Sequence, residues 1–263
     1  MRRLAALSPD ALALLESLGA TRFLSAAQVR ALGGEGASAA VRALARAGLA
    51  ATLPYRPSAT APLERVWVLT ALGAKAAAAR ASHAAGEGGE SDPAVRRAAR
   101  TARADALSAL FLTHNLRLSD LYVALRIHMG QAFAWRTQDE ARIAFRSLAS
   151  ADGRGLVVPD ALVAPPGLPY GADPLVLGAC AIELDRSTMG RSAIDRKLLR
   201  YRELVADRGP FGPLVFVADD PRRRDRLADW LRRAGVEGRT ADAATAVELV
   251  AAFLRGRTGD IDS

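Results

Sequence analysis

Carboxylates lie inside or beside two apolar segments in the second half of the chain, where their chemistry would be unusual. Asp160 ends the run VVPD (157–160), while Glu183 and Asp185 interrupt the run AIELD (181–185). Because strand side chains alternate in direction, Glu183 and Asp185 would point to the same face. An acid among apolar residues is costly unless it is paired or binds a cation. Asp160 and Glu183 on adjacent strands would therefore form an all-oxygen site suited to Mg²⁺ or Mn²⁺.

A lysine follows these acids on the next predicted helix. Of the 36 basic side chains only Lys75 and Lys197 are lysine, so the use of lysine at position 197 is informative. A bound divalent ion can polarise a phosphodiester and activate water. A nearby ammonium would stabilise charge on phosphorus or orient the water, for which arginine is a poor substitute. Together, Asp160, Glu183 and Lys197 predict a site for phosphodiester hydrolysis. The alternative is that the acids pair with Arg186 or Arg196, or cap helices, and that Lys197 is solvated.

The elements around these residues alternate between strands and helices. An amphipathic helix is expected at 116–128, followed by strands at 133–136, 156–163 and 175–184. A helix at 193–206, a strand at 214–218, a helix at 221–234, an edge strand at 239–241 and a helix at 243–255 complete the order. This order predicts an α/β domain whose sheet is covered by helices.

The first eighty residues have a different pattern. Ser8 and Pro9 begin a helix that ends at Gly19, and further helices are expected at 26–32, 39–47 and 71–80, with caps at Ser25 and Ser38. Strand-like residues at 51–53 and 65–69 flank a proline-rich tip. This order predicts a winged helix-turn-helix domain that binds double-stranded DNA through its third helix and its hairpin. The expected contacts are four arginines, each with the alternative of a solvated surface position: Arg42, Arg46, Arg56 and Arg65.

Charge is distributed unevenly along the chain. Residues 1–80 carry ten basic and four acidic side chains, whereas residues 151–263 carry seventeen of each. This excess is typical of a module that meets a phosphate backbone. The polar, glycine-rich stretch 82–92 indicates a linker. We therefore expect a DNA-binding domain at 1–81, a linker at 82–95 and a second domain at 96–263.

Composition excludes several classes of protein. The single cysteine, Cys180, excludes an internal disulfide and a multi-cysteine zinc site, and its apolar neighbours indicate a buried strand position. No uncharged apolar run reaches the length of about 18 residues that a transmembrane helix needs. The N-terminus has two arginines but no long apolar stretch of a secretory signal. We expect a cytoplasmic protein that does not bind membranes.

The order of motifs resembles the replication-relaxation family of plasmid- and mobile-element-associated proteins. The resemblance covers nearly the whole chain. It rests on AGL (47–49), HNLRLSDLYVAL (114–125), PD (159–160), ELDRST (183–188), KLLRY (197–201) and LVFV (214–217). It implies a protein of a plasmid or mobile element that acts in replication.

The second domain is similar to the restriction-endonuclease-like PD-(D/E)XK superfamily. The resemblance implies that Asp120 matches the acid of the first helix, Asp160 the Pro-Asp acid and Glu183 the third-strand acid. Asp185 stands where that superfamily has lysine, and Lys197 would supply the amine from the following helix. Asp185 would then be a further metal ligand. The expected fold class is α/β, with a winged helix followed by this nuclease-like domain.

Two functions follow from these expectations. In the first, the winged helix selects a site on DNA and the second domain nicks one strand with Mg²⁺ or Mn²⁺. In the second, the protein is a non-enzymatic regulator or origin-binding protein, whose degenerate nuclease fold forms a homodimer or recruits replication proteins. A relaxase with a covalent tyrosine is disfavoured, because no histidine-rich metal motif accompanies the four tyrosines.

Overall fold

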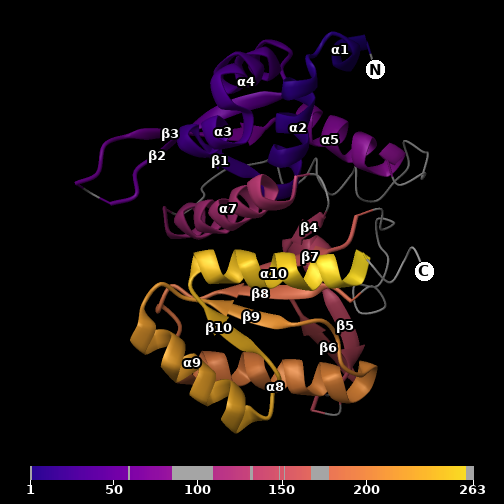
Figure 1. Cartoon of the computed structure of the whole chain (residues 1–263), viewed down its shortest axis with the longest axis vertical. Helices are drawn as coiled ribbons and strands as arrows, with labels where there is room; N and C mark the ends of the chain where they lie inside the picture. Colours follow the sequence, from indigo (N-terminus) through magenta and orange to yellow (C-terminus); the bar gives the residue numbers. More distant parts are fainter. Residues whose placement is uncertain are drawn as a thin grey trace. The chain divides into compact units, whose positions relative to one another are not determined.

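The chain forms two compact units in a computed structural model. The structure describes residues 2–58, 60–84, 109–130, 133–147, 149–150, 152–166 and 178–258. The first unit comprises Met1–Ile127 and the second His128–Ser263. Each unit is treated by itself below, and Figure 1 gives the element labels.

Helices make up most of the first unit. They are α1 (Arg2–Ala5), α2 (Pro9–Thr21), α3 (Ala26–Gly33), the 3₁₀ turn η1 (Gly34–Gly36), α4 (Ala37–Arg46), α5 (Ala71–Ala84) and α7 (Ala109–Met129). The predicted caps Ser8 and Ser25 are confirmed, since their hydroxyls accept hydrogen bonds from the backbone N–H of Ala11 and Gln28. The predicted cap Ser38 is wrong. The chain passes from η1 directly into α4, so Ser38 already lies within the helix.

Three short strands form an antiparallel sheet in the first unit. They are β1 (Phe23–Ser25), β2 (Ala50–Tyr55) and β3 (Glu64–Leu69), in the order β1-β3-β2. The predicted hairpin is confirmed, with Thr52 opposite Trp67. Strand β1 was not predicted, because three residues are too short to show the alternation that marks a strand.

Helix α7 completes the core of the first unit. Its Leu112 and Leu116 cluster with Phe23, Tyr55 and Val66, which come from all three strands. The hydroxyl of Ser119 also donates to the carbonyl of Phe23 at 2.7 Å. The sequence-based division at 1–81, 82–95 and 96–263 assigns this helix to the second domain, whereas its Leu112 and Leu116 pack in the core of the first unit. Most of the expected linker, residues 85–95, lies outside the described residues.

A mixed five-stranded sheet organises the second unit. Its strands are β4 (Ala134–Thr137), β7 (Ala161–Ala164), β8 (Cys180–Leu184), β9 (Leu214–Val217) and β10 (Arg239–Ala241), in the order β10-β9-β8-β7-β4. Strands β8, β9 and β10 are parallel, while β7 and β4 pair antiparallel. Helices α8 (Arg191–Arg208) and α9 (Pro221–Ala234) cover one face and α10 (Ala243–Thr258) the other (Figure 1).

The strand expected at 156–163 is two strands. Strand β6 (Arg154–Val157) forms a separate hairpin with β5 (Ile143–Arg146), which was not predicted, and the short turn η2 (Gln138–Ala141) precedes it. The break falls at Pro159, which has no N–H for a sheet ladder. Asp160 therefore lies in the bend immediately before β7 and does not end the preceding strand. Of the strand expected at 175–184, residues 180–184 form β8, residues 178 and 179 precede the strand, and residues 175–177 lie outside the described part.

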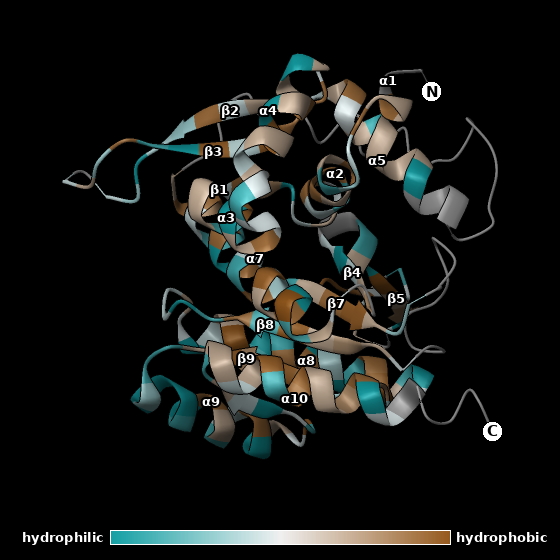
Figure 2. Ribbon diagram, turned by 45° about the horizontal axis from the view of Figure 1, so that its top comes forward, coloured by the Kyte–Doolittle hydropathy of each residue, from teal (hydrophilic) through white to brown (hydrophobic). Residues whose placement is uncertain are grey.

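Burial follows the layers of the second unit. Strands β7 and β9 are buried along their whole length, as expected for a sheet covered on both faces. Figure 2 shows β7 as hydrophobic and much of α9 as hydrophilic. Cys180 is fully buried, and burial raises the pKa of its thiol to about 12, which leaves it protonated and unreactive. None of the described helices combines the length and apolar character needed to cross a bilayer.

Candidate active site

The register of two antiparallel strands brings the first two predicted carboxylates together. Ala161 of β7 pairs with Ile182 of β8, so the preceding residue, Asp160, lies beside the following one, Glu183. The backbone N–H of Leu184 donates to Oδ2 of Asp160 at 2.7 Å. This hydrogen bond holds the Asp160 carboxylate against β8. Asp160 and Glu183 therefore lie side by side as predicted, but Asp160 comes directly before β7 and is not part of that strand.

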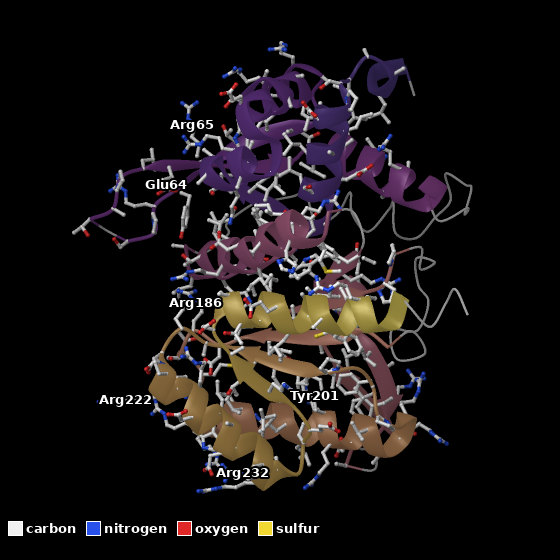
Figure 3. All side chains as sticks on the ribbon, viewed as in Figure 1. Glu64, Arg65, Arg186, Tyr201, Arg222 and Arg232 are labelled. Carbon is white, nitrogen blue, oxygen red and sulfur yellow. The ribbon has the colours of Figure 1, made fainter. Side chains whose placement is uncertain are left out.

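Helix α8 supplies two donors to Glu183. Lys197 and Tyr201 are one helical turn apart, and they contact different oxygens of the carboxylate. The ammonium of Lys197 contacts Oε2, while the hydroxyl of Tyr201 donates to Oε1 at 2.7 Å. Glu183 is 1% exposed and Tyr201 is fully buried. Figure 3 shows Tyr201 in the interior of the second unit.

Burial and charge act in opposite directions on this cluster. Burial raises the pKa of Glu183 to about 7, against the lowering effect of Lys197, while the charge of Asp160 raises it further. Burial alone would lower the pKa of Lys197, but the charges of Glu183 and Asp160 outweigh it and the net pKa is raised. Lys197 is thus an ammonium at neutral pH, and Glu183 is the group that gains or loses a proton there.

Asp185 has a separate partner. Its Oδ2 forms an ion pair with Nε of Arg223 at 2.7 Å, and its Oδ1 accepts from the N–H of Ser187 at 2.7 Å. Arg223 also donates to the carbonyl of Met189 and lies over the ring of Trp230, 4.9 Å from its centroid. Both oxygens of Asp185 thus hold the loop after β8 against α9. The partner is neither Arg186 nor Arg196, the two suggested by the sequence.

Asp120 lies in the first unit. It is exposed on α7, and its Oδ1 accepts a hydrogen bond from Nε2 of Gln28 at 2.6 Å. The same amide donates to the carbonyl of Leu116 at 2.8 Å. In the described structure Asp120 therefore takes part in the contact between α3 and α7.

The four arginines expected at DNA are all exposed. Arg42 and Arg46 lie one turn apart on α4, whose opposite side buries Ala37, Ala40, Val41 and Leu44. Arg56 follows β2, and Arg65 lies on β3 opposite Pro54. Figure 3 shows Arg65 on the hairpin that extends from the first unit.

Two residues of the second unit were not chosen as site residues from the sequence. Tyr201 could have been found, because it follows Lys197 by the four residues of a helical turn. Arg223 carries no comparable signal, since it lies 38 residues from Asp185. Its role is set by how α9 packs.

The donor set of Asp160 and Glu183 fits a divalent ion. Mg²⁺ keeps several waters and is commonly held by one or two carboxylates. Glu183 is buried, and burial disfavours the charged form of its carboxyl group. A cation bound between Glu183 and Asp160 would offset this cost. Within the described residues there is no group of three or more His, Cys, Asp or Glu placed to hold a metal. The set is thus limited to these two carboxylates.

Comparisons with known proteins give one family. A family model described as Replication-relaxation matches residues 15–214. No curated protein matches the chain. Among solved structures, the chain is similar to the crystal structure of protein VC1899 from Vibrio cholerae, with 12% identity and a TM-score of 0.30. That match covers 93% of this chain and 50% of the other, so the chain spans about half of VC1899.

Proposed function

Because the chain belongs to the replication-relaxation family, we propose that it binds double-stranded DNA during replication of a plasmid or mobile element and nicks one strand. The family implies the replication-associated role. Binding and cleavage are assigned to different units of the chain. The observation that supports cleavage is the convergence of three residues: Asp160 directly before β7, Glu183 on β8 and Lys197 on α8.

The first unit has the elements of a winged helix-turn-helix. Helices α2, α3 and α4 precede the β2–β3 hairpin, and β1 adds a third strand to it. In this arrangement the third helix enters the major groove and the hairpin contacts the backbone. Arg42 and Arg46 on α4 are exposed, as side chains that reach DNA must be. Arg56 and Arg65 are likewise exposed, and they would contact DNA from the hairpin.

The second unit has features of a PD-(D/E)XK nuclease. A mixed sheet brings the two acids together, Glu183 on β8 and Asp160 directly before β7, and helices cover both of its faces. In this proposal the amine that the superfamily places two residues after the second acid comes from α8, which the contact of Lys197 with Oε2 of Glu183 supports. Asp185 occupies the usual lysine position and is engaged by Arg223. These contacts support a relocated lysine.

Each residue has a defined task in this proposal. Asp160 and Glu183 would hold Mg²⁺ or Mn²⁺, which when bound polarises the phosphodiester and activates water. Lys197 stabilises negative charge that develops on the phosphate oxygens, or orients the attacking water. Tyr201 fixes the rotamer of Glu183 through its 2.7 Å hydrogen bond. The buried sides of Glu183 and Tyr201 keep bulk water from the rear of the site.

Supercoiled plasmid carrying candidate sites tests the proposal. Incubation with Mg²⁺ or Mn²⁺ should convert it to the nicked form, and Asp160→Asn should abolish the conversion. Asp195→Asn is a matched control, because Asp195 is an exposed aspartate paired with Arg191 on α8. Absence of nicking by the wild type, or nicking that survives in Asp160→Asn, would overturn the enzymatic function.

A non-enzymatic role is the second candidate. It is favoured by one observation: both oxygens of Glu183 and both oxygens of Asp185 already have protein donors. In this case the first unit binds an operator or origin, and the second unit forms a homodimer or recruits replication proteins. DNA binding that is indifferent to chelator, together with no heat of Mn²⁺ binding in calorimetry, would identify this function.

A further inference from the structure

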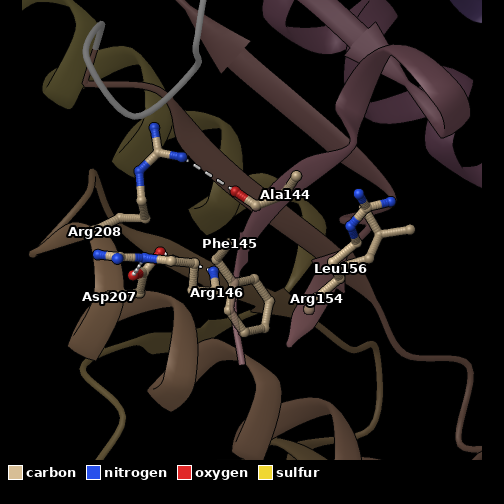
Figure 4. Close-up of a pocket in the computed structure, with 8 residues that line it drawn as sticks. Ala144, Phe145, Arg146, Arg154, Leu156, Asp207 and Arg208 are labelled. Atoms are coloured by element: carbon tan, nitrogen blue, oxygen red, sulfur yellow. Dashed lines mark hydrogen bonds and ion pairs between the residues drawn. The ribbon is translucent and has the colours of Figure 1, made fainter. Parts of the chain in front are cut away.

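A solvent-open groove lies in the second unit, between the β5–β6 hairpin and the C-terminal end of α8. Its volume is about 820 Å³. It is lined by Ala144, Phe145, Arg146, Arg154, Gly155, Leu156, Asp207 and Arg208, so three guanidinium groups face one carboxylate. Figure 4 shows Arg208 and Arg146 near Asp207 on one side and Arg154 on the other.

Two of these residues protect the open edge of β5. Within the described residues β5 pairs only with β6, which leaves its other edge without a strand partner. Asp207 accepts a hydrogen bond from the N–H of Arg146 at 2.9 Å, and Arg208 donates to the carbonyl of Ala144 at 3.2 Å. Side chains that satisfy edge groups prevent unwanted strand pairing. Asp207 and Arg208 therefore have a structural task.

Arg146 and Arg154 add positive charge to the lining of the groove. They are opposite one another in the hairpin register, but their side chains diverge to different sides of the groove (Figure 4). Asp207 also contacts the guanidinium of Arg146, yet the Arg146 side chain remains 89% exposed. One carboxylate among three arginines leaves the groove with a net positive charge. This positive charge is complementary to an anionic ligand.

We propose that this groove binds the phosphate backbone of double-stranded DNA, as a contact additional to α4 and the hairpin of the first unit. The inference rests on the DNA binding of the proposed function. A single phosphate is held best where several donors converge on one point. Here Arg154 lies on the opposite side of the groove from Arg146 and Arg208 (Figure 4), which suits successive phosphates along a backbone.

The salt dependence of DNA affinity tests the groove in the full chain. Each phosphate contact contributes about 0.9 to the slope of log K against log salt concentration. Arg146→Gln/Arg154→Gln should reduce the slope by about two and weaken binding at every duplex sequence. Arg232→Gln/Arg233→Gln is the matched control, because both are exposed arginines on α9, with side chains 74% and 66% exposed. The control should keep the wild-type slope.

Three outcomes would overturn the inference. In the first, Arg146→Gln/Arg154→Gln keeps the wild-type salt slope while Arg42→Ala reduces it. The groove then does not contact DNA, and DNA binding by the first unit stands. If the wild type binds no duplex DNA, the proposed function falls as well. The third outcome is saturable binding of inorganic phosphate that the groove variant loses, with an unchanged DNA slope. That result would assign the groove to free phosphate.

Discussion

Tyr201 of α8 donates its hydroxyl hydrogen to Oε1 of Glu183 on β8 across 2.7 Å, and both side chains are buried. Lys197, one turn earlier on α8, takes the other oxygen. A carboxylate held by two donors from one helix has a fixed orientation toward its neighbour Asp160. The same burial disfavours the charged form of Glu183 and raises its pKa, so the stability of the fold should depend on pH.

Glu183 should make stability depend on pH. Its pKa is raised from 4.5 to about 7 by burial. A carboxyl group with a raised folded pKa stabilises the fold in its protonated form, so this contribution is complete below about pH 4.5 and is lost as pH rises through about 7. Urea unfolding at several pH values should show the wild type losing stability between about pH 5 and 8 relative to Glu183→Gln. Parallel pH profiles of the two proteins would contradict this expectation.

Lys197 should be required for nicking. Loss of one group that stabilises transition-state charge commonly costs about 10²–10³ in rate, so Lys197→Ala should reduce the initial nicking rate by that factor. Lys197→Arg should not restore it, since arginine differs in shape and holds its proton. Lys75→Ala tests the other lysine, which is exposed on α5 of the first unit. Full activity in Lys197→Ala would remove the relocated lysine from the mechanism.

The pair Asp185–Arg223 should be structural. Its side chains are 0% and 6% exposed, so Asp185→Ala leaves a buried guanidinium without its carboxylate and should lower the free energy of unfolding by about 3–5 kcal/mol. Asp195→Ala breaks a half-exposed pair with Arg191 and should cost at most about 1 kcal/mol. Denaturant unfolding in EDTA measures both. A large loss for Asp185→Ala that appears only with Mn²⁺ present would identify Asp185 as a metal ligand instead.

Leu116 should stabilise the first unit although it lies far along the chain. It is 8% exposed and clusters with Phe23 and Val66. Leu116→Ala removes buried methyl groups and leaves a cavity, at a cost of about 2–5 kcal/mol. Leu110→Ala, on the same helix but 68% exposed, should change stability little. Equal effects of the two substitutions in thermal unfolding would contradict the placement of α7 in this core.

Arg42 and Arg46 should contribute to DNA affinity. If each contacts a phosphate, single substitutions to alanine should weaken binding and lower the salt slope by about one. If either reads a base, its loss should relax sequence preference and leave the slope closer to the wild type. Fluorescence anisotropy with several duplexes separates the two cases. Lys75→Gln provides a charge-matched control, and unchanged binding in both arginine variants would exclude α4 from the interface.

Much of the local structure is determined by the sequence. Ser8 and Ser25 accept bonds from N–H groups three residues away, so their capping roles are visible in neighbouring residues. The apolar run of β9 and the helical pattern of α9 also depend on residues close in the chain. The juxtaposition of Asp160 and Glu183 could be predicted as a candidate cation site, because acids among apolar residues are costly unless they are paired or bind a cation.

Only the tertiary structure decided which side chains meet across long separations. Arg223 reaches Asp185 over 38 residues, and Gln28 reaches Asp120 over 92. Neither pair leaves a local pattern, because the choice of partner depends on how helices pack onto the sheets. The sequence by itself therefore determined the carboxylates and the lysine as chemistry-bearing residues. Packing decided that Glu183 joins Lys197 and Tyr201, that Arg223 holds Asp185, and that α7 completes the first core.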